Sequence, residues 1–186
     1  MVGNPTKFDK YDILKCLLLI DEDVSRTSLL EALDRGEGSV RAILDILKQK
    51  GFISSNRQGH SLTKKGIETK NRISNLISLK KCNLEIFPGQ KAAFIIRTNK
   101  TLELGYAERD LAIKNGADAA LILQYKDGFK IPGGANSKAL KKLFDFQNKD
   151  VLLITAAPKQ SLAERAGLVV CAELIPELEK VVNSFY

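Results

Sequence analysis

The stretch from Ser25 to Gly66 constrains the fold of this chain more than any other part, because it combines several helix signals with the signals for a short hairpin. Ser25 can cap a short helix whose leucines recur at helical spacing. Two glycines within 34–38 then mark a sharp turn, and a second helix is predicted over 39–50. The second helix follows the turn at once.

The helix predicted at 39–50 has two unlike faces. An apolar stripe is formed by Val40, Ile43, Leu44 and Leu47. The remaining positions are small or polar: Ser39, Arg41, Ala42, Asp45, Lys48 and Gln49. The pattern indicates a helix that buries one side and leaves the other free to contact a partner.

A hairpin is predicted after this helix. Gly51 stands where a helix C-terminal cap belongs, residues 52–56 favour a strand, and a turn at 57–60 precedes residues 61–63. Thr63 can then cap a further helix that begins Lys64-Lys65-Gly66. The order helix, turn, helix, hairpin, helix is that of a winged helix-turn-helix, in which the hairpin is the wing.

The strings "LDRGEGSVRAILDILKQKGFI" and "HSLTKKG" resemble the winged-helix domains of bacterial and archaeal transcription regulators. Within them, "GEGSVRAIL" is similar to the DNA-reading segment of sugar-responsive repressors. The resemblance ends near Lys81. Beyond it, "AERDLAIKNGADAALILQYKDGFKIPGG" looks like an uncharacterised archaeal domain found behind such winged helices, which implies an association and no activity.

The uneven charge of the chain points to a polyanion. Residues 46–81 contain nine Lys or Arg and one acidic residue, Glu68, within a chain whose net charge is +7. A solvated charged face is the plain alternative, but together with the helix-turn-helix pattern we expect double-stranded DNA as partner. The expected DNA-contacting residues are Ser39, Arg41, Ala42, Lys48, Arg57, His60, Lys64 and Lys65.

Two helices flank this region. The first is expected at Phe8–Ile20, with Lys10, Asp12 and Lys15 facing away from the core, and the acidic run at 21–23 after it should not face DNA. The second is expected at 64–81 and carries the stripe Ile67, Ile73, Leu76 and Ile77. That stripe could pack inside its own domain or against a second copy of the chain, and we expect a homodimer.

Strand-like and helix-like stretches alternate in the rest of the chain. Strands are expected at 92–96, 119–125, 151–154 and 168–170, with an Asp-Gly turn leading to an antiparallel return strand at 129–131. Helices are expected at 104–115, 137–146, 158–166 and from Pro176. The sequence therefore predicts two domains, a winged helix at 1–81 and a mixed, mostly parallel α/β domain at 82–186.

We expect the second domain to bind a small effector or to mediate assembly. Flexible backbone before a helix start and two threonines at strand ends suggest an anion site, although the glycines could simply end a hairpin and the serine cap a helix. The residues concerned are Thr98, Gly133, Gly134, Ser137 and Thr155. His60 is the only histidine, and motifs for metal, nucleotide or redox cofactors are missing, so we expect neither catalysis nor a cofactor.

The remaining expectations concern location and function. The longest apolar run, Cys16 to Ile20, is too short to cross a bilayer and no signal-peptide pattern is seen, which favours the cytoplasm. Cys16, Cys82 and Cys171 should be buried free thiols and not a disulfide or metal site. The chain is expected to be a sequence-specific DNA-binding transcriptional regulator. The alternative is an enzyme or protein-interaction module whose winged helix binds no DNA.

Overall fold

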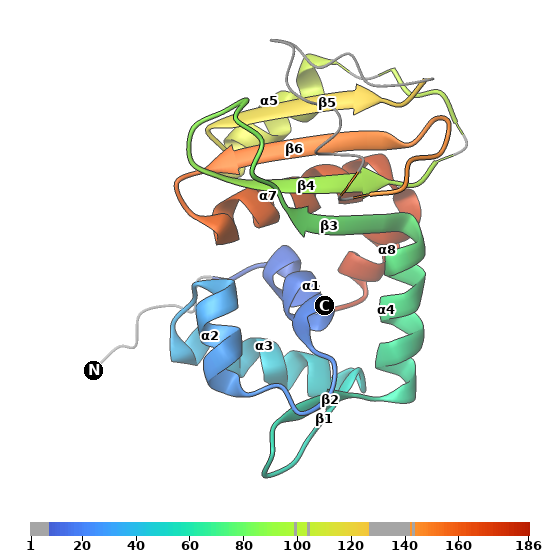
Figure 1. Cartoon of the computed structure of the whole chain (residues 1–186). Coiled ribbons are helices and arrows are strands. Elements are labelled where there is room, and N and C mark those ends of the chain that lie inside the picture. Colours follow the sequence, from blue (N-terminus) through green and yellow to red (C-terminus); the bar gives the residue numbers. More distant parts are fainter. Residues whose placement is uncertain (1–7, 99, 104, 127–141, 143) are drawn as a thin grey trace. The chain divides into compact units, whose positions relative to one another are not determined.

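The computed structural model describes residues 8–98, 100–103, 105–126, 142 and 144–186, which form two compact units (Figure 1). Unit 1 consists of Met1–Ile73 together with Pro176–Tyr186, and unit 2 is Ser74–Ile175. The division expected between residues 81 and 82 differs from this arrangement. Residues 77–81 join the sheet of unit 2, and the last helix packs on the first helix of unit 1.

Unit 1 is mostly helical. Its elements follow the expected order of three helices, a hairpin and a helix, with one more helix from the end of the chain: α1 (Lys10–Leu19), α2 (Arg26–Leu33), α3 (Glu37–Gln49), β1 (Ile53–Ser55), β2 (His60–Leu62), α4 (Lys64–Leu76) and α8 (Pro176–Asn183). The expected caps at both helix starts are present. Ser25 Oγ accepts the N–H of Ser28 at 3.1 Å, and Thr63 Oγ1 accepts that of Gly66 at 3.1 Å.

α1 is more deeply buried than its sequence indicates. Asp12 and Lys15, expected on the outer face, are 2% and 4% exposed. Each charge has a partner from another element. The Asp12 carboxylate accepts hydrogen bonds from the Arg35 guanidinium at 3.1 to 3.2 Å, and Lys15 Nζ donates to the Ala32 carbonyl at 2.7 Å. Burial of these groups is tolerated because they are paired, and the pairs tie α1 to the α2–α3 region.

The apolar stripe on the helix after the hairpin is buried at Ile73 and Ile77 only. α4 ends at Leu76, and Ile77–Lys81 is strand β3, so the helix expected up to residue 81 is five residues too long. Ile73 is fully buried and Ile77 is 4% exposed. Ile73 and Ile77 therefore offer no surface for a second copy of the chain, whereas Ile67, earlier on the same helix, is 47% exposed.

Unit 2 contains a four-stranded sheet with the order β3-β4-β6-β5. Its other elements are β4 (Gln90–Ile96), α5 (Tyr106–Lys114), β5 (Ala119–Gln124), β6 (Val151–Ala157) and α7 (Gln160–Leu174). All neighbouring strands are antiparallel, so the expectation of a mostly parallel sheet is wrong. β4 and β5 do point in the same direction, but β6 lies between them and runs opposite to both.

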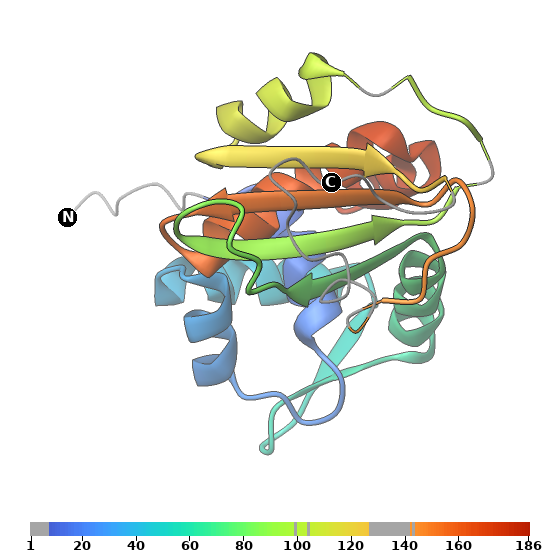
Figure 2. The same cartoon turned by 45° about the horizontal axis from the view of Figure 1, so that its top comes forward.

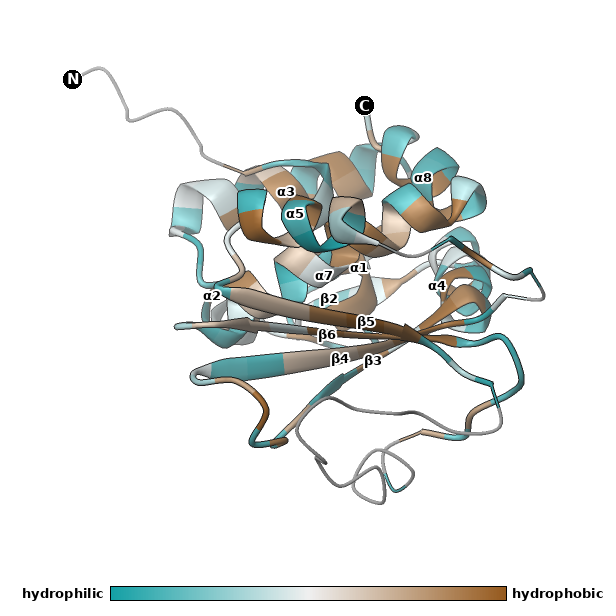
Figure 3. Ribbon diagram, turned by 90° about the horizontal axis from the view of Figure 1, so that it is seen from above, coloured by the Kyte–Doolittle hydropathy of each residue, from teal (hydrophilic) through white to brown (hydrophobic). Residues whose placement is uncertain are grey.

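α5 and α7 cover one face of this sheet (Figure 2). The brown strands β5 and β6 in Figure 3 reflect long apolar runs, because the second face also buries apolar side chains. The cluster on that second face consists of Cys82, Leu84, Ala93, Ile95, Phe144, Leu152 and Ile154. All three cysteines of the chain are free and buried, as expected.

One expected strand is part of a helix. Residues 168–170 lie in the middle of α7, where every side chain from Ala166 to Ala172 is buried. Gly167 lets this helix approach β4, because a Cβ at residue 167 would lie 2.0 Å from Cε2 of Phe94. The expected return strand at 129–131 and most of the helix at 137–146 lie outside the described residues. No helix within the described parts of the chain is long and apolar enough to cross a membrane.

Candidate nucleic-acid interface

α3 presents the polar face that the sequence predicts. Gly36 is its N-cap, and the buried side consists of the expected stripe Val40, Ile43, Leu44 and Leu47. On the opposite side, Arg41, Asp45, Lys48 and Gln49 are exposed, while Ser39 and Ala42 are partly buried. The exposed part of α3 is therefore made of charged and polar side chains.

Arg41 is held by a carboxylate one turn earlier on α3. Its Nη2 donates to Glu37 Oε1 at 3.0 Å, and Nη1 of Arg26, from α2, lies 3.6 Å from the same oxygen. Neither Arg26 nor Glu37 was among the DNA-contacting residues expected from the sequence. The i, i+4 spacing of Glu37 and Arg41 was a usable signal, whereas Arg26 joins only through the packing of α2 on α3.

His60 lies at the start of β2, beside two cations from other elements. Its Nδ1 is 2.8 Å from Ser55 Oγ on the paired strand. Partial burial, and then the positive charges of Arg26 and Lys48, lower the pKa of His60 below its ordinary value. The arrangement brings two cations, Arg26 of α2 and Lys48 of α3, near His60 of β2, whose lowered pKa favours its neutral form; we call these three residues the cationic cluster.

The hairpin turn is shaped by Asn56 and Gly59. Asn56 Oδ1 accepts the backbone N–H groups of Gln58 at 2.7 Å and Gly59 at 2.9 Å. Gly59 passes so close to residues 23 and 24 that a Cβ would lie 2.8 Å from their carbonyl oxygens. Arg57 is exposed in this turn, where the sequence places it.

The two lysines at the start of α4 differ in their surroundings. Lys64 is exposed. Lys65 Nζ donates to the Lys50 carbonyl at 2.6 Å and lies 4.4 Å from the centroid of the Phe52 ring. Lys65 thus has contacts within unit 1 that a phosphate would have to displace, which its position in the sequence does not reveal.

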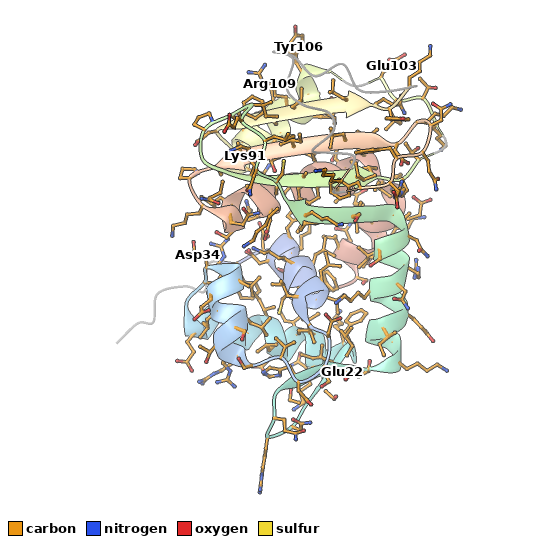
Figure 4. All side chains as sticks on the ribbon, viewed as in Figure 1. Glu22, Asp34, Lys91, Glu103, Tyr106 and Arg109 are labelled. Carbon is orange, nitrogen blue, oxygen red and sulfur yellow. The ribbon has the colours of Figure 1, made fainter. Side chains whose placement is uncertain are left out.

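Acidic residues border the hairpin on another side. The segment at 21–24 pairs with β2, through two backbone hydrogen bonds of 3.0 Å between Val24 and His60. Glu22, labelled in Figure 4, lies in this segment. A hollow of about 660 Å³ is lined by Asp21, Glu22, Asp23, Ser61, Leu62 and Ile67. Its charge would repel phosphate, so the candidate interface is the face of α3 with the cationic cluster and the turn at Arg57.

The net charge of unit 1 does not single it out as the candidate DNA-binding unit; only the local grouping of charges on the α3 face does. Unit 1 contains fourteen Lys and Arg against twelve Asp and Glu, whereas unit 2 contains fifteen against ten. Two of the nine basic residues counted at 46–81, Lys80 and Lys81, belong to β3 in unit 2. The charge argument for DNA therefore depends on how a few side chains are grouped.

The structure does not bring the expected effector residues together. Thr98 follows β4, whereas Thr155 pairs with Ala92 near the other end of that strand, so the two are about 20 Å apart at roughly 3.3 Å per residue. Thr155 is fully buried, and its hydroxyl donates to the Ala163 carbonyl at 2.7 Å. Because β4 and β6 are antiparallel, their C-terminal ends lie at opposite ends of the sheet. Gly133, Gly134 and Ser137 lie outside the described residues.

Comparison with known protein families also divides the chain into two parts, one in each unit. Residues 10–68 match the family model of the PH0730-like, N-terminal domain, and residues 88–174 match that of a domain of unknown function (DUF4443). No curated protein matches the chain.

A solved structure also resembles it, the hypothetical protein PH0730 from Pyrococcus horikoshii OT3. It is 28% identical in sequence, the match covers 94% of this chain and 100% of that chain, and the TM-score is 0.78. The chain is thus similar over nearly its whole length to an archaeal protein of the same fold.

Proposed function

We propose that the chain is a sequence-specific DNA-binding transcriptional regulator whose unit 1 acts as a winged helix. The observation that carries this proposal is the cationic cluster beside the exposed polar face of α3. A major groove accepts one helix, and cations beside that helix can contact the flanking phosphates. In this arrangement α3 reads bases, and Arg57 in the hairpin turn reaches the backbone.

The experiment is a binding titration with duplex DNA. A duplex selected from a random pool is titrated at several salt concentrations, with wild-type protein and with Lys48→Ala, Arg41→Ala and Lys126→Ala. Lys48→Ala should reduce the salt slope by about 1, as expected for one lost phosphate contact. Arg41→Ala should cost about 1–3 kcal/mol on the selected duplex and much less on a scrambled one.

Lys126→Ala is the matched control, because it removes an exposed lysine from unit 2 that lies outside α5 and should leave both affinities unchanged. Absence of duplex binding at low salt, or binding without salt dependence, would refute the proposal.

The second candidate function is a protein-interaction module. An interaction surface on α3 would expose large apolar side chains. Those that are exposed within the described residues are Ile67, Tyr106, Ile113 and Tyr186, and α3 contains none of them. This distribution favours nucleic acid for α3.

For unit 2 we propose effector binding or assembly, without catalysis. Tyr106, labelled in Figure 4, is 81% exposed, and Ile113 lies two turns later on the same helix at 40%. Such a face supports assembly as a homodimer, which would double the few base contacts that one unit offers. Light scattering at micromolar concentration tests this. A monomer, or a dimer unaffected by Ile113→Asp, would exclude this face.

A further inference from the structure

Glu37 is an acidic residue within the candidate interface. It is the first residue of α3, its side chain is 61% exposed, and one of its carboxylate oxygens faces two guanidinium groups from two helices. Arg41 is bound at 3.0 Å and Arg26 lies at 3.6 Å. A negative charge inside a surface that binds DNA needs a reason, because it repels every phosphate nearby.

Stability gives no such reason. Exposed ion pairs contribute little to folding and exchange readily with solvent. The position at a helix N-terminus does favour a carboxylate, but any acidic residue there would serve. The specific feature is the pairing with Arg41, which lies one turn later on the same exposed face.

We propose that Glu37 determines the base preference of the α3 face. Its carboxylate accepts a hydrogen bond from the N4 amino group of a cytosine, and the Glu37–Arg41 pair directs the guanidinium toward O6 and N7 of a nearby guanine. Carboxylates accept from cytosine and arginine donates to guanine in the major groove. Because the same carboxylate repels phosphate, it also keeps Arg26 and Arg41 from binding the DNA backbone without regard to sequence.

This inference rests on the proposed DNA-binding function and predicts an effect opposite to that of losing a simple contact. Glu37→Gln removes the negative charge at almost constant volume. Binding to a scrambled duplex should then become several-fold tighter, with a salt slope larger by about 1, because one more cation is available to phosphate. The ratio between selected and scrambled affinities should fall by about tenfold.

The experiment compares wild type, Glu37→Gln and Glu179→Gln by fluorescence anisotropy, with the selected and the scrambled duplex at three salt concentrations. Glu179 is an exposed glutamate on α8, so its variant removes the same charge from the same unit and should leave the ratio unchanged. Equal melting temperatures establish that the variants are folded. A repeat selection with Glu37→Gln should lose the cytosine that the wild type prefers.

The outcomes separate the two proposals. If wild type binds the selected duplex with salt dependence but Glu37→Gln leaves the ratio unchanged, or weakens both duplexes equally, the role of Glu37 is refuted while DNA binding stands. An equal drop in the ratio for Glu179→Gln would attribute the effect to net charge and also refute it. If wild type binds no duplex, both proposals are refuted together.

Discussion

Replacement of Phe185 tests whether the end of the chain completes unit 1. Phe185 is 1% exposed, and its ring meets that of Phe52 edge to face, with centroids 5.7 Å apart and planes at 81°. Truncating a buried Phe to Ala costs about 3–5 kcal/mol. Of this, about 0.5–1.5 kcal/mol belongs to the aromatic pair itself. Such a loss is a large part of the stability of an ordinary domain, about 5–15 kcal/mol.

The neighbouring residue provides the control. Tyr186 is 66% exposed, and its contact with Lys50 is made by its backbone oxygen at 2.7 Å, which Tyr186→Ala preserves. That variant should change stability by no more than about 0.5 kcal/mol. Urea unfolding followed by circular dichroism measures both variants, and hydrogen exchange of amides in α3 and β6 shows which unit opens first.

Phe185→Ala should raise exchange in α3 well before β6. A double-mutant cycle with Phe52→Ala should give a coupling of about 0.5–1.5 kcal/mol. If Phe185→Ala is no more destabilising than Tyr186→Ala, or if exchange rises equally in both units, the last residues are not part of the unit 1 core and the reasoning fails.

Three further predictions concern single positions. Gly167→Ala should destabilise unit 2 by about 1–3 kcal/mol in urea unfolding, because its Cβ would overlap the buried ring of Phe94. Gly36→Ala has no atom within 4 Å of the new Cβ and should cost less, about 0.5 kcal/mol, since alanine is only a poorer N-cap than glycine. The pKa of His60 is lower in the folded chain than in the unfolded chain, so the unfolded chain binds a proton more readily. The contribution of His60 to stability is therefore complete above about pH 6.5 and is lost as the pH falls below that value. Melting temperatures should therefore fall more steeply for wild type than for His60→Gln between about pH 7 and pH 5, and parallel curves would contradict this. Burial raises the pKa of Cys16 to about 12 and raises that of Cys171, so neither thiol should react with a disulfide reagent until the chain unfolds; rapid labelling of the native protein would contradict this.

Local patterns predicted unit 1 well because its signals are local. The caps at Ser25 and Thr63 and the stripe on α3 each depend on residues a few positions apart, and the structure has all of them. The burial of Asp12 and the closeness of Arg26 to His60 depend on tertiary packing. No spacing within a single helix could reveal them.

The sheet of unit 2 shows where such patterns fail. β4, α5 and β5 read as a strand, helix and parallel strand, and β4 and β5 do run the same way. The two strands are not adjacent, however, because β6 lies between them, and β6 comes from much later in the chain. Residues 168–170 look like a buried strand because a helix buried on all sides shows no periodicity either. The pairing of Thr98 with Thr155 in one site depended on the parallel sheet and fails with it.

The discontinuity of unit 1 has a consequence for protein synthesis. All the residues that we assign to DNA contact lie before residue 66, whereas Phe185 and α8 are made only after the whole of unit 2. Domains generally fold as units during translation. A nascent chain released anywhere within unit 2 would contain every candidate contact residue but lack α8 and Phe185, which complete the core of unit 1. If unit 1 binds DNA as proposed, incomplete products should bind it less tightly than the finished protein.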